Sequence, residues 1–470
     1  MKLNSKKYPD YKNTDIEWMG EVPKHWEIDR LKWATELPVN GTWGSEANND
    51  EYDTLCIRVA DFDRQRLIVD RQNEKTYREI EEKDLKSRSL ETGDLLLEKS
   101  GGGEKQLVGA VIQYDLDERA VCSNFVARMR PRENFDSRFL TYLYDHLYSG
   151  KVNYCSIKQT TGIQNLDSQA YLDEKVAYPP LPEQKAIATF LDHQTTRIDQ
   201  LIEKKKRVLD LLDEQRQATI TRAVTKGINP NAKKKDSGIE WLGEVPEHWD
   251  LNRLKFYTQI NPVKSEVSHL PEDFEVTFTP MEAVKEFGGL DTKEIKTIGD
   301  VYTGYTYFKE GDVLTAKITP CFENGKAAIA KDLKNGIGFG TTELHVLRPN
   351  SNLINKFLFY MIISEPFLKV GESEMLGAGG QKRVRQEFLE DWIWGFPSVD
   401  EQKEIIDFIE EQSLKIDYLK RKIAKAIDHL EEYRSSLITQ AVTGKIDVRN
   451  EVSEQTLSYA AEEGEAYTTN

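Results

Sequence analysis

The chain has 470 residues, of which 39% are hydrophobic and 31% are charged, and its formal net charge is −16. That length predicts about three domains, and the acidic balance counts against a protein that coats nucleic acid through charge alone. The sequence has no apolar run near the ~20 residues of a membrane helix, and its start lacks the apolar core of a signal peptide, so we expect a cytoplasmic protein. The four cysteines are scattered, so we expect neither a metal site nor a disulfide framework: Cys56, Cys122, Cys155 and Cys321.

The opening of the chain contains a phrase that recurs. Residues Ile16–Trp26 read IEWMGEVPKHW and Ile239–Trp249 read IEWLGEVPEHW, with nine of eleven positions identical. Further pairs recur 218 residues apart: Gly93-Asp94 with Gly311-Asp312, Arg130-Pro131 with Arg348-Pro349, Phe139-Leu140 with Phe357-Leu358, and Glu183-Gln184 with Glu401-Gln402. The chain therefore consists of two copies of one unit. We interpret the repeated tryptophans as packing anchors and the repeated histidines as structural: Trp18, Trp26, Trp241, Trp249, His25 and His248.

The first copy opens with a predicted globule at residues 1–181. Short β-rich stretches are broken by Gly, Pro and Asp, and a helical stretch follows at Arg138–Leu147. This pattern indicates an α+β globule built mainly on small sheets. The strands expected here are Thr54–Val59, Asp94–Leu97 and Leu107–Ile112.

A long helix is predicted at 182–227. The stretch from Glu183 to Lys226 contains no Gly or Pro, a proline-rich run sets up its start, and Gly227 marks its end. A lysine-rich linker at 228–237 follows. The apolar residues of the helix recur at helical spacing: Ile187, Phe190, Leu191, Ile198, Leu201, Val208, Leu211, Leu212 and Ile220.

The second copy repeats this organisation. A second globule is predicted at 238–398, a second long helix at 399–447 ending near Gly444, and an acidic disordered tail at 448–470. The globule's expected elements are strands at Val313–Ile318 and Leu344–Leu347 and a helix at Asn355–Ile363. In the long helix, apolar residues step alternately by three and four, a heptad seam typical of helices that pack lengthwise: Ile416, Leu419, Ile423, Ala426, Leu430, Tyr433 and Leu437.

The two long helices are expected to pack against each other. Two like units usually pair about a two-fold axis, which makes the helices antiparallel. The predicted fold class is therefore α+β, with two globules in a pseudo-two-fold tandem repeat joined by two long helices packed as an antiparallel coiled coil. The alternative is two ordinary core helices, each buried in its own globule. A length of ~60 Å at 1.5 Å per residue and charged outer faces favour the long pair.

The order of these motifs resembles the specificity subunit of a type I restriction–modification system, a prokaryotic family. The resemblance rests on a W-x-G-x-x-P-x-H-W opening, a variable globule, a P-x-x-E-Q helix ending in I-T-x-A-V-T, and the repetition of all three. It covers about Asp15 to Val448. The second helix start departs slightly, because Pro397-Ser398-Val399-Asp400-Glu401-Gln402 replaces the Pro-Leu-Pro-Glu-Gln form of the first.

The resemblance implies that each globule is a target-recognition domain that reads one half of a split site in double-stranded DNA. It implies that the paired helices set the unread gap and dock two methyltransferase subunits, and that motor–nuclease subunits complete the complex. The chain itself is then non-catalytic and holds no cofactor, since S-adenosylmethionine, ATP and Mg are expected only on the partner subunits. Both globules are acidic overall, so we expect weak, salt-sensitive DNA binding by the chain alone.

Two loops in each globule are candidates for DNA contact. The first follows the strand after each Gly-Asp pair and combines glycines with side chains that suit phosphate, although it is equally typical of a solvated hairpin. The second precedes each long helix and carries Gln, Asn or Arg, which suit base edges. A third loop, Arg58–Arg66, is a weaker candidate. The candidate residues are Lys99, Ser100, Lys105, Gln106, Lys158, Gln159, Thr160, Lys317, Asn324, Lys326, Gln381, Lys382, Arg383 and Arg385.

Two other functions are alternatives to this one. A fused DNA methyltransferase needs an (N/D)-P-P-(Y/F) loop, and the sequence has no stretch that fits this pattern. The sequence also has no G-K-(S/T) phosphate loop. A protein-only coiled-coil scaffold explains the helices but leaves two diverged globules without a purpose. The nearest matches to the methyltransferase loop all depart from it: Asn229-Pro230-Asn231, Asn261-Pro262-Val263 and Tyr178-Pro179-Pro180-Leu181.

Overall fold

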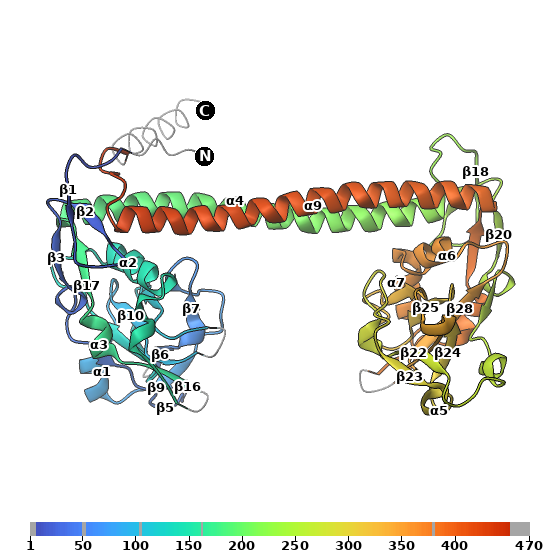
Figure 1. Ribbon diagram of the computed structural model, residues 1–470, viewed down its shortest axis with the longest axis horizontal. Coiled ribbons are helices and arrows are strands. Elements are labelled where there is room, and N and C mark those ends of the chain that lie inside the picture. The colour runs from blue at the N-terminus through green and yellow to red at the C-terminus, as the bar shows by residue number, and fades with distance from the viewer. Residues whose placement is uncertain (1–5, 49–52, 103–105, 161–162, 378–380, 452–470) are drawn as a thin grey trace. The chain divides into compact units, whose positions relative to one another are not determined.

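The computed structural model describes residues 6–48, 53–102, 106–160, 163–377 and 381–451 (Figure 1). The chain forms two compact units: unit 1 is Met1–Lys204 with Ala426–Asn470, and unit 2 is Lys205–Lys425. The long helices are α4 (Leu181–Lys226) and α9 (Val399–Val442). Each unit therefore consists of one globule with one part of each long helix.

The described part of unit 1 is built on small sheets, as expected. Their strand orders are β4-β14-β10-β12-β8-β7, β13-β6-β9-β5 and β11-β16-β15, with the pairs β1-β2 and β17-β3. The strands are β1 (Tyr11–Asn13), β2 (Glu21–Pro23), β3 (Glu27–Arg30), β4 (Val39–Asn40), β5 (Ser45–Glu46), β6 (Asp53–Ile57), β7 (Phe62–Asp63), β8 (Ile68–Val69), β9 (Tyr77–Glu79), β10 (Leu95–Glu98), β11 (Ser100–Gly101), β12 (Val111–Gln113), β13 (Ala120–Cys122), β14 (Val126–Met129), β15 (Ile157–Thr160), β16 (Ile163–Leu166) and β17 (Lys175–Tyr178). The shorter helices are α1 (Glu82–Arg88), α2 (Ser137–Ser149) and α3 (Ser168–Leu172).

The described part of unit 2 follows the same plan. Its sheets have the orders β21-β28-β25-β26 and β23-β22-β27-β24, with the pairs β18-β19 and β20-β29. The strands are β18 (Lys234–Asp236), β19 (Glu244–Pro246), β20 (Asp250–Arg253), β21 (Thr258–Ile260), β22 (Glu275–Thr279), β23 (Ile295–Thr297), β24 (Thr306–Lys309), β25 (Val313–Ala316), β26 (Ala327–Ile329), β27 (Ile337–Gly340), β28 (Leu344–Pro349) and β29 (Ile393–Phe396). The helices are α5 (Ile298–Val301), α6 (Asn355–Ile362), α7 (Glu365–Ser373) and α8 (Gln386–Asp391).

The predicted strand at Leu107–Ile112 is wrong in its first four residues, because β12 begins only at Val111. The carbonyl groups of Leu107 and Val108 accept hydrogen bonds from the Tyr148 hydroxyl and the Asn153 amide, both at 2.8 Å. Gly109 follows with φ +105°, a conformation that an L side chain rarely adopts. Side chains, not a neighbouring strand, therefore satisfy the carbonyl groups of Leu107 and Val108.

A buried ion pair explains two of the landmarks that the copies share. Asp94 lies at the start of β10 and accepts both hydrogen bonds of a fork from the Arg130 guanidinium, at 2.8 and 2.9 Å. Asp312 accepts the same fork from Arg348, at 2.7 and 2.8 Å. Both carboxylates are almost fully buried. A bidentate arginine–carboxylate pair is strong and directional, so in each unit it ties the Gly-Asp turn to the end of the neighbouring strand.

The repeated opening phrase is explained by the first glutamate of each long helix. Glu183 accepts hydrogen bonds from the Trp26 indole at 2.9 Å and contacts His25 at 2.7 Å. Glu401 does the same with Trp249, at 3.0 Å, and His248, at 2.8 Å. Both indoles are buried, so these tryptophans are packing anchors and these histidines hold the opening phrase to the helix start.

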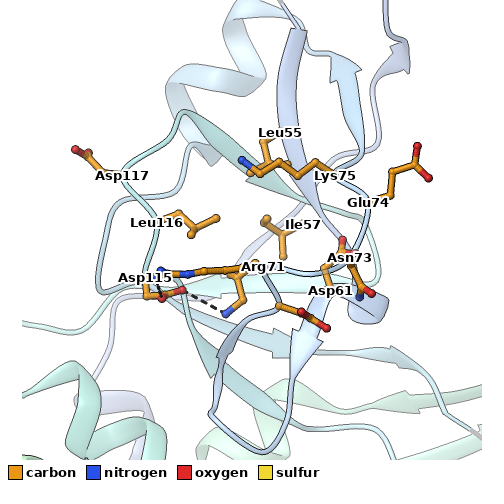
Figure 2. A pocket seen from close by; sticks show the side chains of 12 residues that line it. Leu55, Ile57, Asp61, Arg71, Asn73, Glu74, Lys75, Asp115, Leu116 and Asp117 are labelled. Atoms are coloured by element: carbon orange, nitrogen blue, oxygen red, sulfur yellow. Dashed lines mark hydrogen bonds and ion pairs between the residues drawn. The ribbon is translucent and has the colours of Figure 1, made fainter.

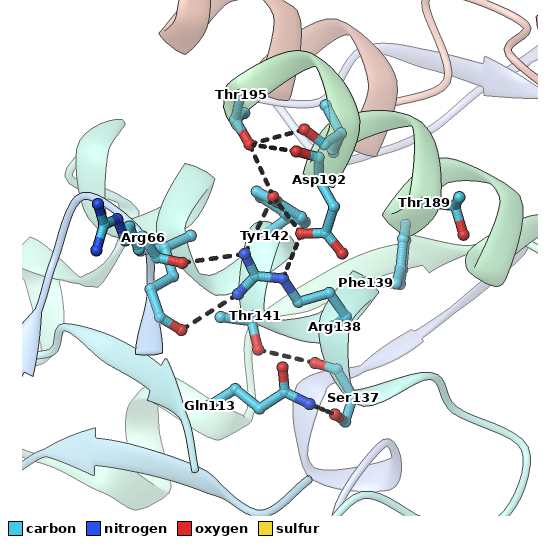
Figure 3. Close-up of polar contacts among 12 residues, drawn as sticks. Arg66, Gln113, Ser137, Arg138, Phe139, Thr141, Tyr142, Thr189, Asp192 and Thr195 are labelled. Carbon is cyan, nitrogen blue, oxygen red and sulfur yellow. Dashed lines mark hydrogen bonds and ion pairs between the residues drawn. The ribbon is translucent and has the colours of Figure 1, made fainter. Parts of the chain in front are cut away.

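In unit 1, a polar network ties α2 to α4 (Figure 3). The Arg138 guanidinium donates to Asp192 at 2.6 Å, and the Tyr142 hydroxyl donates to the same carboxylate at 2.7 Å. Arg138 also donates to the carbonyl groups of Arg66 and Leu67. Helix α2 therefore joins the loop after β7 to the long helix.

The long helices contact each other within each unit. In unit 1, Asp199 of α4 pairs with Arg434 of α9 at 3.1 Å. In unit 2, Asp213 pairs with Lys420 at 2.6 Å, and Arg216 pairs with Asp417. As the residue number in α4 rises, the residue number of its partner in α9 falls. The helices therefore pack antiparallel, which confirms the prediction.

The predicted seam is wrong at several positions. Leu201, Val208 and Leu211 of α4 are 39–46% exposed, and Leu419 of α9 is 45% exposed. The buried stripe of α4 contains the predicted Ile198, Leu212 and Ile220, and it also contains Ile202, which the prediction left out. Only a narrow stripe of each helix faces its partner in a two-helix pair, and at 100° per residue the exposed leucines and valine lie to one side of it.

A glycine follows each long helix: Gly227 comes directly after α4, and Gly444 lies two residues after the last residue of α9. Gly227 and Gly444 have φ +70° and +67°, the left-handed cap conformation that glycine favours. The lysine beside each glycine then binds an opening segment: Lys226 donates to the Glu244 carbonyl at 2.6 Å, and Lys445 donates to the Met19 carbonyl at 3.1 Å. The end of α9 is thus attached to the opening of unit 1. Residues 452–470 of the predicted tail lie outside the described residues.

Candidate nucleic-acid interface

The two candidate loops of unit 1 come together in one sheet. β11 pairs with β16, with Ser100 opposite Asn165, and β16 pairs with β15. The backbone N–H of Leu166 also donates to the Lys99 carbonyl at 2.8 Å. The segment after β10 and the segment before α4 therefore form one continuous surface.

Two candidates at the centre of this surface are fixed by neighbouring amides. The Lys99 ammonium donates to Asn40 Oδ1 at 2.7 Å, and burial lowers the pKa of Lys99. The Ser100 hydroxyl donates to Asn165 Oδ1 at 2.6 Å. Asn165 itself is exposed. This part of the sheet thus presents oriented donors and acceptors, as a base-reading surface requires.

Two further candidates lie at the rim of the same surface. Lys158 forms an ion pair with Asp167 at 2.7 Å, but its side chain is 73% exposed, so the pair contributes little and a phosphate could replace it. The Gln106 amide faces the Arg64 guanidinium and, with its oxygen turned toward it, accepts at 2.9 and 3.0 Å. Lys105 lies outside the described residues, and of Gln159 and Thr160 only the backbone is described.

The third, weaker loop is occupied by internal ion pairs. Arg58 pairs with Asp61 at 2.7 Å, and Arg64 pairs with the buried Glu98 at 2.9 Å. Burial raises the pKa of Glu98, and Arg64 opposes that rise. These two arginines neutralise carboxylates of their own globule, so they offer little charge to DNA.

In unit 2 the two candidate loops also meet. Ile318 forms a β-bridge with Arg383. The N–H of Val384 donates to the Lys317 carbonyl at 2.8 Å, and the N–H of Thr319 donates to the Lys382 carbonyl at 3.0 Å. The sheet surface of unit 1 therefore has a counterpart in unit 2 made from the corresponding segments.

The candidate side chains of unit 2 divide into two groups. Asn324 donates to Glu286 at 3.2 Å and Lys326 donates to the Met281 carbonyl at 3.3 Å, so both are held by the segment after β22. The Arg383 guanidinium forms a fork with the Glu343 carboxylate, at 2.9 and 3.0 Å. The remaining candidates beside it are exposed: Gln381, Lys382 and Arg385.

Two residues that the sequence reasoning missed lie at these surfaces. Phe125 is 49% exposed, and its carbonyl accepts from the N–H of Lys99 at 2.8 Å. Glu343 occupies the same place in unit 2, where its carbonyl accepts from the N–H of Lys317 at 2.9 Å. Phe125 lies directly before β14 and Glu343 directly before β28. The two residues are 218 positions apart, so the repeat spacing alone could have paired them.

A separate cavity in unit 1 does not suit DNA (Figure 2). It has an apolar floor of Leu55, Ile57, Val69 and Leu116 and a volume of about 350 Å³. The rim carries Arg71 and Lys75, which pair with Asp115 and Glu118 at 2.7 and 2.6 Å. The other charged groups at the rim are carboxylates, which repel phosphate: Asp61, Asp70, Glu74 and Asp117.

No group of three or more His, Cys, Asp or Glu side chains within the described ranges is arranged to hold a metal ion. None of the helices described is both long and apolar enough for a membrane crossing.

The chain matches a family model, that of the type I restriction modification DNA specificity domain, over residues 23–211 and 276–428. It is similar to the type I restriction enzyme EcoAI specificity subunit of Escherichia coli, with 48% identity over 183 residues, 36% of this chain and 31% of that protein. The EcoEI specificity subunit of the same species is 41% identical over 42% of this chain and 33% of that protein. The chain thus matches about a third of the length of these two relatives.

Other similarities extend over nearly the whole chain. The putative MjaX specificity subunit of Methanocaldococcus jannaschii is 24% identical over 94% of this chain and 98% of that protein. Among solved structures, a chain of a type I R-M system has a TM-score of 0.64 at 15% identity, covering 90% of this chain and 98% of its own. The HsdS subunit of Thermoanaerobacter tengcongensis has a TM-score of 0.51 at 16% identity over the same shares; at these identities the likeness concerns the fold. With its family model matched over most of its length, the chain belongs to the type I restriction modification DNA specificity family.

Proposed function

We propose that each unit reads one half of a split site in double-stranded DNA through the surface where its two candidate loops meet. The observation that carries this proposal is that the two surfaces have the same backbone hydrogen bonds but different side chains. We call these shared hydrogen bonds the backbone frame. The same hydrogen bonds link Lys99 to Phe125 and Lys317 to Glu343. Readers of two different half-sites need the same placement and different side chains, because sequence is read by side-chain contacts to base edges.

The candidate residues divide into two roles within this proposal. Lys158, Lys382 and Arg385 contact phosphate, since they are exposed and cationic. Those at the centre of each surface contact bases, with Lys99 and Ser100 in unit 1 and Arg383 in unit 2. Asn324 and Lys326 are held by the segment after β22 and take neither role.

We further propose that α4 and α9 dock two methyltransferase subunits and set the unread gap. Both helices expose apolar side chains, although charged residues cover most of their outer faces. Apolar side chains that gather on an exposed surface often mark a partner surface. In α4 these are Leu201, Val208 and Leu211, and in α9 they are Leu414, Tyr418 and Leu419. Helix α4 has 46 residues, which is roughly 70 Å, twice the ~35 Å of one DNA turn.

The partner subunits supply the chemistry in this proposal. Methyltransferase subunits bring S-adenosylmethionine and methylate adenine, and motor–nuclease subunits with ATP and Mg complete the complex. The methyltransferase subunits also close around the DNA and provide phosphate contacts that the acidic chain lacks.

The test is co-expression with the neighbouring methyltransferase subunit and genome-wide mapping of methyladenine. A split motif with two short halves and a fixed gap supports the proposal. Exchanging residues 238–398 for another globule should then change one half only. A complex that forms without producing any motif would contradict the reading role. If no complex forms, the docking role of the helices is wrong and a protein-only scaffold becomes the better account.

A further inference from the structure

Arg383 is held in one orientation from both its backbone and its side chain. Its N–H and carbonyl exchange hydrogen bonds with Leu376, at 2.9 and 3.1 Å. Its guanidinium donates through Nε and Nη2 to the two oxygens of Glu343. Nη1 makes only a long contact of 3.4 Å with the Gln381 carbonyl. The outer edge of the guanidinium, formed by Nη1 and the second N–H of Nη2, therefore remains available for another partner.

Folding alone gives no reason for this arrangement. The side chain of Arg383 is 42% exposed and that of Glu343 is 25% exposed. At this exposure water and salt screen an ion pair, so it contributes less to stability than a buried pair does. In the same unit, the structural ion pair between Arg348 and Asp312 is buried, with side-chain exposures of 13% and 1%. The Glu343 carboxylate instead orients an arginine that faces solvent.

Asn165 occupies the corresponding position in unit 1. Leu166, the next residue, donates to the Lys99 carbonyl at 2.8 Å, as Val384 after Arg383 donates to the Lys317 carbonyl at 2.8 Å. Asn165 is also exposed, and its Oδ1 is fixed by the Ser100 hydroxyl at 2.6 Å. One frame thus presents an oriented amide in unit 1 and an oriented guanidinium in unit 2.

We infer that Arg383 and Asn165 are the base-reading residues at equivalent positions of the two half-sites, with Arg383 recognising guanine and Asn165 recognising adenine. Glu343 is a positioning residue for Arg383. The two-donor edge of arginine matches the O6 and N7 acceptors of guanine, and the amide of asparagine matches the N6 donor and N7 acceptor of adenine. This inference rests on the proposed DNA-reading function and assigns which side chain of each surface reads which base.

The experiment uses the complex of the full chain with its co-expressed methyltransferase subunit. After the wild-type motif is mapped, methylation rates are measured on duplexes carrying each of the four bases at every motif position. In Arg383→Gln, preference for guanine should fall about tenfold or more at one position of one half, and the other half should be unchanged. Asn165→Ala should relax one adenine in the other half. Glu343→Gln should weaken the same guanine preference as Arg383→Gln, and Glu343→Asp, which keeps a carboxylate, should restore it.

The matched control is Arg253→Gln. Arg253 pairs with Asp391 in the same unit, at 3.1 Å and 50% exposure, but lies on β20 outside the surface, so its motif should equal the wild type. If the complex that carries Arg383→Gln methylates no duplex, the complex that carries Arg383→Lys is measured in its place, because lysine keeps the charge but cannot form the fork. An unchanged guanine preference in the variant that methylates overturns the inference, and so does a wild-type motif that contains no guanine. A wild type that methylates no split motif overturns the proposed function itself, which separates the two failures.

Discussion

At the scale of the residue, the fork between Asp94 and Arg130 is the clearest case of a buried charge that depends on its partner. Asp94 is 1% exposed and Arg130 is 26% exposed. Asp94→Ala leaves the guanidinium without its main partner, and breaking a buried pair costs about 3–5 kcal/mol. Since Arg130 is partly hydrated and keeps Glu91 at 2.7 Å, we expect a loss of about 2–4 kcal/mol in the free energy of unfolding. Denaturant titration of the chain measures it, and Glu91→Ala, which removes a 68% exposed partner, should change little.

Asp145 of α2 gives a pH dependence with a definite sign. Burial raises its pKa from 3.8 to about 6, although Arg434 and Arg138 oppose the rise. Because the folded-state pKa is the higher one, the folded chain binds more protons than the unfolded chain between those values. The contribution of Asp145 to stability therefore falls as pH rises from 3.8 through about 6, and the burial penalty is complete above that range.

Asp145→Asn removes this ionisable group. The variant should unfold at a higher temperature than the wild type above pH 7 and gain least at the acid end, where Asp145 is already protonated in both states. Thermal melting of both proteins across pH measures the difference, and the paired comparison cancels the other titrating groups. An equal gain at pH 4 and pH 8 would contradict the assigned pKa.

At the scale of the element, the start of each long helix depends on its first glutamate. Glu183 is 6% exposed and serves Trp26, His25 and also Tyr8, whose hydroxyl donates at 2.7 Å. Glu401 is 21% exposed and serves Trp249 and His248. Alanine at either position leaves buried donors unpaired, which costs about 1–3 kcal/mol each time.

We expect Glu183→Ala to destabilise its unit more than Glu401→Ala does, since Glu183 is more buried and has one partner more. Limited proteolysis with fragment mapping reports each unit separately. Glu411→Ala is the control, because Glu411 is 63% exposed and pairs only with Lys415 along the helix. The prediction is contradicted if unit 1 of Glu183→Ala resists the protease as well as unit 2 of Glu401→Ala does.

An element could be predicted well where neighbouring residues alone determine it, and poorly where distant residues do. Helices α4 and α9 could be bounded to within a few residues, since a run without Gly or Pro between a proline start and a glycine end is local information. The strands were less predictable because most have two to five residues and depend on distant partners. The failure at Leu107–Val108 came from Tyr148 and Asn153, whose side chains take the place of a strand.

The candidate site was predictable in location but not in the partners of its side chains. Loop position placed Ser100 and Arg383 on the surfaces where the loops meet. That Glu343 would orient Arg383 could not be foreseen, because the two residues are 40 positions apart and nothing in their spacing brings them together. The exposed Leu201 and Leu419 show the same limit, since apolar spacing alone cannot separate a residue in the seam from one beside it.

At the scale of the whole molecule, the two copies share the contacts that stabilise the fold and differ in the side chains at the candidate surfaces. The Asp94–Arg130 and Asp312–Arg348 forks are the same, and so are the glutamates that bind each opening tryptophan. The exposed positions differ, with Phe125 and Asn165 on one frame and Glu343 and Arg383 on the other. A duplicated scaffold with unlike tips suits recognition of two unlike half-sites.

The net charge of −16 sets how the chain by itself should bind DNA. Phosphate contacts dominate affinity and weaken as salt rises, and many of the cations described here are paired with carboxylates, as Lys158 is with Asp167. We expect the isolated chain to bind duplex DNA in the range of about 1–100 μM at physiological salt, with affinity rising steeply as salt is lowered. The proposed complex with methyltransferase subunits should bind its site far more tightly, because in that proposal the partners provide the phosphate contacts that the acidic chain lacks. Fluorescence anisotropy across a salt series measures both. Nanomolar, sequence-specific binding by the isolated chain at 0.15 M salt would show that the partners are not needed for phosphate contact.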